Sequence, residues 1–123
     1  MSIKIGELAK MTNVSQRTIH YYEELGLISS LERKGQSHRQ YDEVTAERIE
    51  KIKVLKNIGL SLDEIAEVIH LYFEPDTVVE GKRKVIKMLE KQLAETDAKI
   101  SDLKNFKKDI EKNISHIKSF IKE

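Results

Sequence analysis

Four polar side chains of different chemical kinds recur along one short stretch at the spacing of a helix face. Gln16, Arg17, His20 and Tyr21 carry an amide, a guanidinium, an imidazole and a phenol. Side chains three and four residues apart are neighbours on the surface of a helix. A face with these groups suits the major groove of DNA, where amide and guanidinium groups form hydrogen bonds to base edges. The spacing therefore predicts a helix whose outer face can read nucleic acid.

The residues around this face carry signals that begin and end a helix. Ser15 is a good N-cap, because its hydroxyl can accept a hydrogen bond from a backbone N–H of the first turn. Gly26 lies where a glycine often ends a helix, since it takes a positive φ at little cost. Ile19, Tyr22 and Leu25 would then face inward. We therefore expect a helix between Ser15 and Gly26 that presents its polar face to solvent.

A first helix is expected over residues 4–11, where Ile5, Leu8 and Met11 have helical spacing. Thr12 and Asn13 supply the turn between the two helices. Two short helices joined by a turn of three or four residues are typical of a helix-turn-helix. On this pattern alone, an ordinary helical hairpin remains an alternative.

Residues 28–41 show no helical periodicity. The turn signal at residues 35–37 separates two short segments, 31–34 and 38–41, which predicts a small β-hairpin, or wing. Basic side chains gather near its tip, where they could contact phosphates beside a groove. They are Arg33, Lys34, His38 and Arg39. A solvated loop with ordinary Lys and Arg residues is the alternative.

Two further helices follow. Asp42 can cap the first, over residues 43–58, and Gly59 ends it. Ser61 and Glu64 form a capping-box pattern that begins the second, over residues 62–72. The buried face expected for the first of them consists of Val44, Ile49, Ile52, Leu55 and Ile58. The second has its apolar positions at Leu62, Ile65, Ala66, Ile69 and Leu71. The join resembles a second helix-turn-helix, and Lys56 beside it is either a phosphate ligand or an unremarkable exposed lysine.

The last part of the chain predicts one long helix. Thr77 and Glu80 have capping-box spacing, and no Pro interrupts the chain from there to Ile121. Apolar residues recur at alternating steps of four and three residues, with Thr96 and Lys107 as polar exceptions. The expected dimerisation positions are Leu89, Leu93, Ile100, Leu103, Ile110, Ile114, Ile117 and Ile121. A helix of about 44 residues would be roughly 66 Å long, so this stripe predicts a coiled coil with a second copy. A helix folded back on itself is disfavoured, because no turn residues interrupt it.

Composition excludes several classes of function. The 123 residues contain no cysteine, so disulfides, thiolate metal sites and a cysteine nucleophile are excluded. The four histidines are scattered and no Gly-rich phosphate loop is present, so we expect no catalytic residue, no metal site and no cofactor. No signal peptide or apolar run of about 20 residues is visible, which predicts a soluble cytoplasmic protein without a membrane partner.

Net charge gives no simple support for DNA binding. Residues 1–77 contain 10 basic and 13 acidic residues, whereas residues 78–123 contain 12 and 8. The half expected to bind DNA is thus the acidic half, so the prediction rests on the local pattern. The basic second half leaves an alternative function open: a structural protein that anchors DNA while its helix binds a protein or membrane partner.

Taken together, the motifs resemble those of the MerR family of bacterial transcription regulators. The matching segments are IGELA at residues 5–9, VSQRTIHYYEELGL at 14–27, GQSHRQY at 35–41 and LKNIGLSLDEI at 55–65. The resemblance implies a mainly α fold, with a winged helix-turn-helix DNA-binding domain (residues 1–74) followed by a dimerisation helix (residues 75–123) that forms an antiparallel coiled coil. It also implies a homodimer that binds a palindromic promoter in double-stranded DNA and distorts an overlong spacer so that RNA polymerase can engage it.

The resemblance and the residue pattern together define the expected DNA-binding set. It consists of Ser15, Gln16, Arg17, Thr18, His20, Tyr21, Tyr22, Arg33, His38, Arg39, Tyr41 and Lys56. One member departs from the family, which usually has Arg at the position of His20. A guanidinium is always charged, whereas an imidazole need not be. The target promoter, the sign of regulation and any effector are left open by the sequence.

Overall fold

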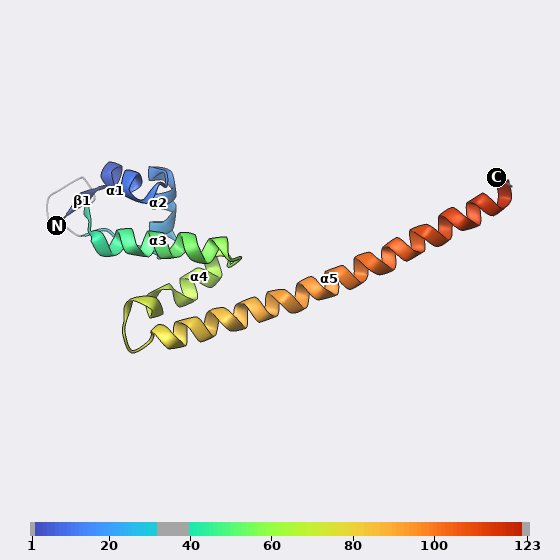
Figure 1. Cartoon of the computed structure of the whole chain (residues 1–123). Helices are drawn as coiled ribbons and strands as arrows, with labels where there is room; N and C mark the ends of the chain where they lie inside the picture. Colours follow the sequence, from blue (N-terminus) through green and yellow to red (C-terminus); the bar gives the residue numbers. More distant parts are fainter. Residues whose placement is uncertain (1, 32–39, 122–123) are drawn as a thin grey trace. The chain divides into compact units, whose positions relative to one another are not determined.

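The computed structural model describes residues 2–31 and 40–121, and most of its elements are labelled in Figure 1. In chain order they are β1 (Ile3–Lys4), α1 (Ile5–Thr12), α2 (Gln16–Glu24), β2 (Gln40–Tyr41), α3 (Glu43–Asn57), α4 (Leu62–Val68), the 3₁₀-helix η1 (Ile69–Phe73) and α5 (Val78–Ile121). The predicted class is confirmed: the fold is mainly α, with a small antiparallel β pairing and a long C-terminal helix. The chain divides into two units, residues 1–86 and residues 87–123.

Helices α1 and α2 form the predicted helix-turn-helix. Asn13 follows α1 in the left-handed conformation, with φ of 56°, and turns the chain toward α2. Ser15 is the N-cap, and its hydroxyl oxygen accepts a hydrogen bond of 3.0 Å from the backbone N–H of Thr18. The helix is thus fixed at its first turn by the residue that the sequence indicated.

The end of α2 is a Schellman motif centred on Gly26, whose φ is 76°. The N–H of Leu27 donates to the carbonyl oxygen of Tyr22 at 2.9 Å, and the N–H of Gly26 donates to that of Glu23 at 3.0 Å. These bonds satisfy carbonyl groups that a helix end otherwise leaves free. Both ends of α2 are therefore defined by hydrogen bonds within its own flanking residues.

Strand β1 is an element that the sequence did not reveal. It pairs antiparallel with β2, in the register Ile3 with Tyr41. On the other side of β2, the N–H of Leu31 donates to the carbonyl oxygen of Gln40 at 2.6 Å in an antiparallel bridge. The two segments that flank the predicted wing are thus paired at its base. The wing residues Arg33, Lys34, His38 and Arg39 lie outside the described residues.

Helix α3 supplies much of the core, but two predicted core positions are wrong. Its N-cap Asp42 accepts from the N–H of Thr45 at 3.0 Å, and the apolar residues Ile49, Ile52 and Leu55 are buried as expected. Val44 and Ile58 are instead exposed. The buried face runs back from residue 49 to Thr45, one turn earlier, so Val44 lies off it. Ile58 is the C-cap and no longer continues the helix.

The capping box before α4 is present with both of its hydrogen bonds. The N–H of Glu64 donates to the Ser61 hydroxyl at 3.2 Å, and the Glu64 carboxylate accepts from the Ser61 N–H at 2.9 Å. The helix is shorter than predicted, because the chain continues as η1 from Ile69. Ala66, one of its apolar positions, is exposed, whereas Val68 is buried.

The first turns of α5 belong to the compact N-terminal unit. Gly81 and Val85 are buried there. A Cβ at Gly81 would lie 3.0 Å from the Cβ of Leu71 and 3.3 Å from a ring carbon of Tyr72, so this glycine permits α5 and η1 to pack closely. Thr77, at the start of α5, donates its hydroxyl to the carbonyl of Leu71 at 2.9 Å. The compact unit therefore extends past residue 74, to residue 86.

Candidate nucleic-acid interface

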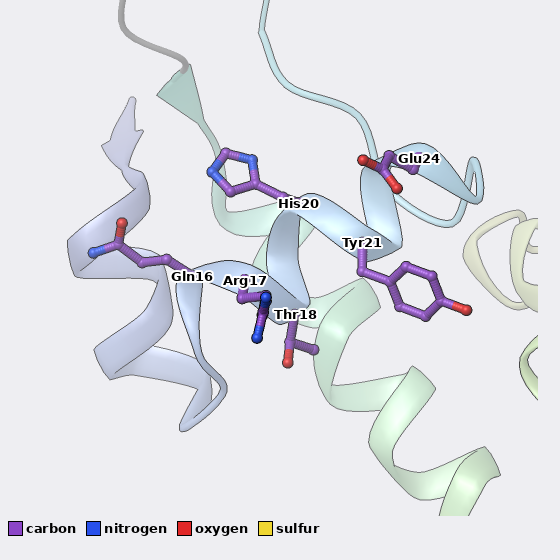
Figure 2. A pocket seen from close by; sticks show the side chains of 6 residues that line it. All are labelled: Gln16, Arg17, Thr18, His20, Tyr21 and Glu24. Atoms are coloured by element: carbon purple, nitrogen blue, oxygen red, sulfur yellow. The ribbon is translucent and has the colours of Figure 1, made fainter.

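The outward face of α2 forms a shallow, open hollow whose lining residues all carry a polar or charged group. Figure 2 shows the six side chains that line it, all of them on α2. They are Gln16, Arg17, Thr18, His20, Tyr21 and Glu24. Five were predicted to bind DNA and are here brought together on one surface. Tyr21 is 49% exposed, so a large part of its ring is available to a ligand.

The polar groups of this face are not used by the fold. Within residues 2–31 and 40–121, the side chains of Gln16, Arg17, His20 and Tyr21 make no hydrogen bond or ion pair. Their donors and acceptors are therefore free to bind an external partner. The backbone that carries them is nevertheless fixed, because α2 is capped at both ends.

Ser15 and Thr18 serve the start of the helix. Besides the cap bond, the two hydroxyl oxygens lie 2.9 Å apart and share a hydrogen bond. In the structure these two bonds orient the first turn of α2. Each hydroxyl retains acceptor capacity with which it could also meet a ligand.

Two predicted DNA ligands prove to be core residues. Tyr22 is 3% exposed and Tyr41 is 0% exposed. Burial raises the pKa of the Tyr22 phenol. The Tyr41 hydroxyl donates to the Glu23 carboxylate, which joins β2 to α2. In the structure Tyr41 thus joins β2 to α2, and Tyr22 belongs to the core beneath the outward face of α2, while their predicted contacts with DNA stay predictions.

The Tyr41 hydroxyl gives the first testable prediction. Tyr41→Phe should lower the free energy of unfolding by about 1.5–3 kcal/mol, because a hydrogen bond to a charged group is lost. Urea denaturation of the two proteins measures the difference. Tyr21→Phe is the matched control, since its hydroxyl has no partner among the described residues and its loss should leave stability nearly unchanged. Equal stability of Tyr41→Phe and wild type would contradict the prediction.

Lys56 lies exposed near the end of α3. It has no hydrogen-bond or ion-pair partner in the described part of the chain, whereas other basic side chains of α3 do have partners. The Arg48 guanidinium donates to the carbonyl of Leu27 at 3.4 Å, and the Lys53 ammonium donates to the carbonyl of Thr12 at 2.7 Å. Arg48 and Lys53 therefore support the helix-turn-helix, while Lys56 is free to meet an anion.

The apolar stripe predicted for α5 lies unpaired on a single helix. Ile100 is 47% exposed and Leu103 is 66% exposed. The rest of the predicted seam is also exposed, except for Leu89, which is partly buried; the exposed members are Leu93, Ile110, Ile114, Ile117 and Ile121. The polar seam residue Thr96 bonds back to the carbonyl of Gln92 at 2.8 Å, so its hydroxyl is satisfied within the helix. This part of the chain buries little by itself.

Glu24 is the lining residue that the sequence-based prediction omitted. It lies four residues after His20 and seven after Arg17, so the same helical spacing that identified the others could have identified it. Its negative charge distinguishes it from the basic, amide and hydroxyl groups that were predicted to bind DNA.

Among residues 2–31 and 40–121, no group of three or more His, Cys, Asp or Glu side chains is placed to hold a metal ion. None of the helices in the same ranges is both long and apolar enough to cross a membrane.

The capped, outward-facing α2 defines this chain as a helix-turn-helix protein. Residues 3–71 match the profile described as MerR HTH family regulatory protein, and residues 46–112 match that described as MerR, DNA binding. The chain belongs to the MerR family of helix-turn-helix regulatory proteins.

Two relatives and one solved structure are similar to this chain. The HTH-type transcriptional regulator ZntR of Escherichia coli is 30% identical over 111 residues, which cover 89% of this chain and 76% of ZntR. The nodulation protein NolA of Bradyrhizobium diazoefficiens is 35% identical over 112 residues, 91% of this chain but 46% of NolA. The chain thus spans less than half the length of that relative. The solved structure is the crystal structure of HiNmlR, a MerR-family regulator lacking the sensor domain and bound to promoter DNA. It matches with a TM-score of 0.56 and 22% identity, over 86% of this chain and 78% of HiNmlR. This match shows a common fold.

Proposed function

We propose that this chain is a sequence-specific transcriptional regulator that binds a palindromic promoter as a homodimer and distorts the spacer DNA. The observation that carries the proposal is the face of α2, where four polar side chains have no partner in the described chain while both helix ends are fixed. Membership of a family of regulatory proteins supports this function over that of a structural DNA anchor.

In this proposal α2 enters the major groove. Arg17 can form two parallel hydrogen bonds to guanine O6 and N7, and Gln16 can form two to adenine N6 and N7. His20 and Tyr21, one turn later, extend the contacts along the same face. Ser15 and Thr18 hold the first turn of the helix in place and can also contact the backbone of the DNA.

Phosphate contacts would fix the position of α2 on the duplex without reading sequence. We assign this role to Lys56 and to the wing residues Arg33, His38 and Arg39. The bridge between Leu31 and Gln40 supports the assignment of a wing, because it pairs the two segments from which the wing would extend.

A second copy of the chain would supply a second α2 for the other half-site. The exposed seam of α5 supports a homodimer through an antiparallel coiled coil, since apolar positions at this spacing bury their side chains against a partner helix. A dimer presents two copies of α2 to two half-sites, which explains a palindromic target. We retain the functional division into a DNA-binding part (residues 1–74) and a dimerisation part (residues 75–123), and infer that the dimer acts on promoter DNA together with RNA polymerase in the cytoplasm.

Binding to DNA selected from a random library tests the proposal. We expect a palindromic sequence to emerge, and its affinity to fall by about a thousandfold or more between 50 and 200 mM salt if six or more phosphates are contacted. Fluorescence anisotropy with labelled duplexes measures both. Failure to enrich any sequence, or affinity for DNA that does not depend on salt, would overturn the proposal. Co-sedimentation with anionic vesicles, in place of selective DNA binding, would favour the structural anchor.

A further inference from the structure

Glu24 stands out on the reading face because of its charge. Among the six described side chains that line the hollow of α2, it alone is acidic (Figure 2). It lies one turn after His20 and Tyr21 and two turns after Arg17. An acid at this place repels phosphates, so its presence needs a reason other than general attraction to DNA.

Within the described residues, the fold does not explain the acid at Glu24. It is the last residue of α2, where the helix dipole concentrates partial negative charge and disfavours a carboxylate. The last turn of α2 has no basic residue to offset it. The adjacent Glu23 accepts a hydrogen bond from Tyr41, whereas Glu24 has no hydrogen bond or ion pair within residues 2–31 and 40–121. The carboxylate is thus exposed, unpaired and in an unfavourable position for the stability of its own helix.

We propose that Glu24 is a specificity-determining residue whose carboxylate accepts a hydrogen bond from the N4 amino group of a cytosine in the major groove. This inference rests on the proposed function. An ionised carboxylate only accepts hydrogen bonds, so it cannot pair with the acceptors guanine O6 or thymine O4. Arg17 only donates. Glu24 therefore requires a hydrogen-bond donor on the base that it contacts, whereas Arg17 requires an acceptor. The two residues lie near opposite ends of one helix face.

The spacing of these two residues predicts the spacing of the bases. Seven residues of helix from Arg17 to Glu24 span about 10.5 Å. Base pairs along a strand are separated by about 3.4 Å. If α2 lies along the groove, the cytosine read by Glu24 lies about three base pairs from the guanine read by Arg17. The same carboxylate weakens binding to unrelated sequences, because it approaches phosphates or acceptor edges there without a compensating donor.

Parallel selection experiments with the full chain test the inference. Wild type, Glu24→Gln and Glu47→Gln are each used to select duplexes from a random library. Glu47 is the matched control, since it is an exposed acid on α3 with no partner in the described chain. Replacing the selected cytosine with thymine should cost wild type and Glu47→Gln about tenfold in affinity, as for one lost base contact. Glu24→Gln should lose less than twofold, and should bind random duplex more tightly than wild type.

The outcomes separate this inference from the proposed function. If wild type selects no sequence, the proposed function fails and the role of Glu24 fails with it. If wild type selects a palindrome and Glu24→Gln keeps the same cytosine preference, only the role of Glu24 is overturned. Thermal unfolding supplies a second measurement: Glu24→Gln should have an unchanged or higher Tm, because an unfavourable charge is removed from the helix end. A lower Tm together with lost binding would show that Glu24 supports the fold, and would overturn the assignment.

Discussion

Replacing Ile100 with Asp should leave the protein monomeric and abolish its binding to a palindromic site. Ile100 lies in the middle of the exposed stripe of α5, and a coiled coil would bury it against the partner helix. Placing an unpaired carboxylate in such a seam costs several kcal/mol per chain. Sedimentation equilibrium measures the mass, and anisotropy with the selected duplex measures the binding.

Ser101→Asp is the control for this variant. It introduces the same group at the next residue of the same helix, at an exposed position outside the stripe. It should therefore remain dimeric and bind as wild type does. The core residues of the N-terminal unit, such as Ile49 and Ile52, are untouched by either change, so near-native thermal unfolding of that unit is expected in both. A dimeric mass for Ile100→Asp would mean that the seam has been assigned to the wrong residues.

Arg17→Ala should weaken binding to the selected site by about ten- to a hundredfold and should relax the base preference at one position in each half-site. Binding to random duplex should fall much less, because a base contact is lost and most phosphate contacts remain. Anisotropy titrations on the selected duplex, on its single-base variants and on random duplex provide the comparison.

Lys56→Ala is the matched variant for Arg17→Ala. It removes one positive charge from an exposed position, and we expect it to weaken binding to all sequences by a similar factor and to lower the salt slope by about one per contacted phosphate. Each variant thus serves as the control for the other. If Arg17→Ala lost the same factor on the selected and the random duplex, its assigned role in base reading would be wrong.

The sequence predicts the elements whose ends are set by neighbouring residues. Ser15, Asp42 and Ser61 each cap a helix by a bond to a backbone N–H three residues later, and Gly26 ends α2 with a positive φ. Such bonds span a few residues, so the local pattern contains all the information that they need. The 44-residue length of α5 was also predictable, because nothing in that stretch interrupts a helix.

Features that depend on distant residues were missed. Strand β1 has two residues and exists only because it pairs with β2, far along the chain. The hydroxyl of Tyr41 bonds to Glu23, which lies 18 residues earlier, and no local pattern reveals that contact. Val44 was misplaced because several apolar positions on α3 are compatible with helical spacing, and only the packed core selects among them.

The same distinction between local signals and contacts with distant residues applies to the candidate site. The outward positions of α2 follow from its helical spacing, and five of the six side chains in the hollow were predicted. Glu24 was not predicted, because a carboxylate repels phosphates, although its spacing fits the same helix face. Tyr22 was included because of its resemblance to the family motif, whereas the structure packs it beneath the face.

The two side chains from α3 that bond to the backbone on either side of α2 have a consequence for the kinetics of recognition. Lys53 holds the carbonyl of Thr12 just before α2, and Arg48 holds that of Leu27 just after it, so α2 is tethered to α3 on both sides. The reading helix is thereby preorganised, and little conformational entropy of its backbone remains to be lost on association. Correct and incorrect sequences should then be encountered at similar rates, and discrimination between them should appear chiefly as a difference in the lifetime of the complex.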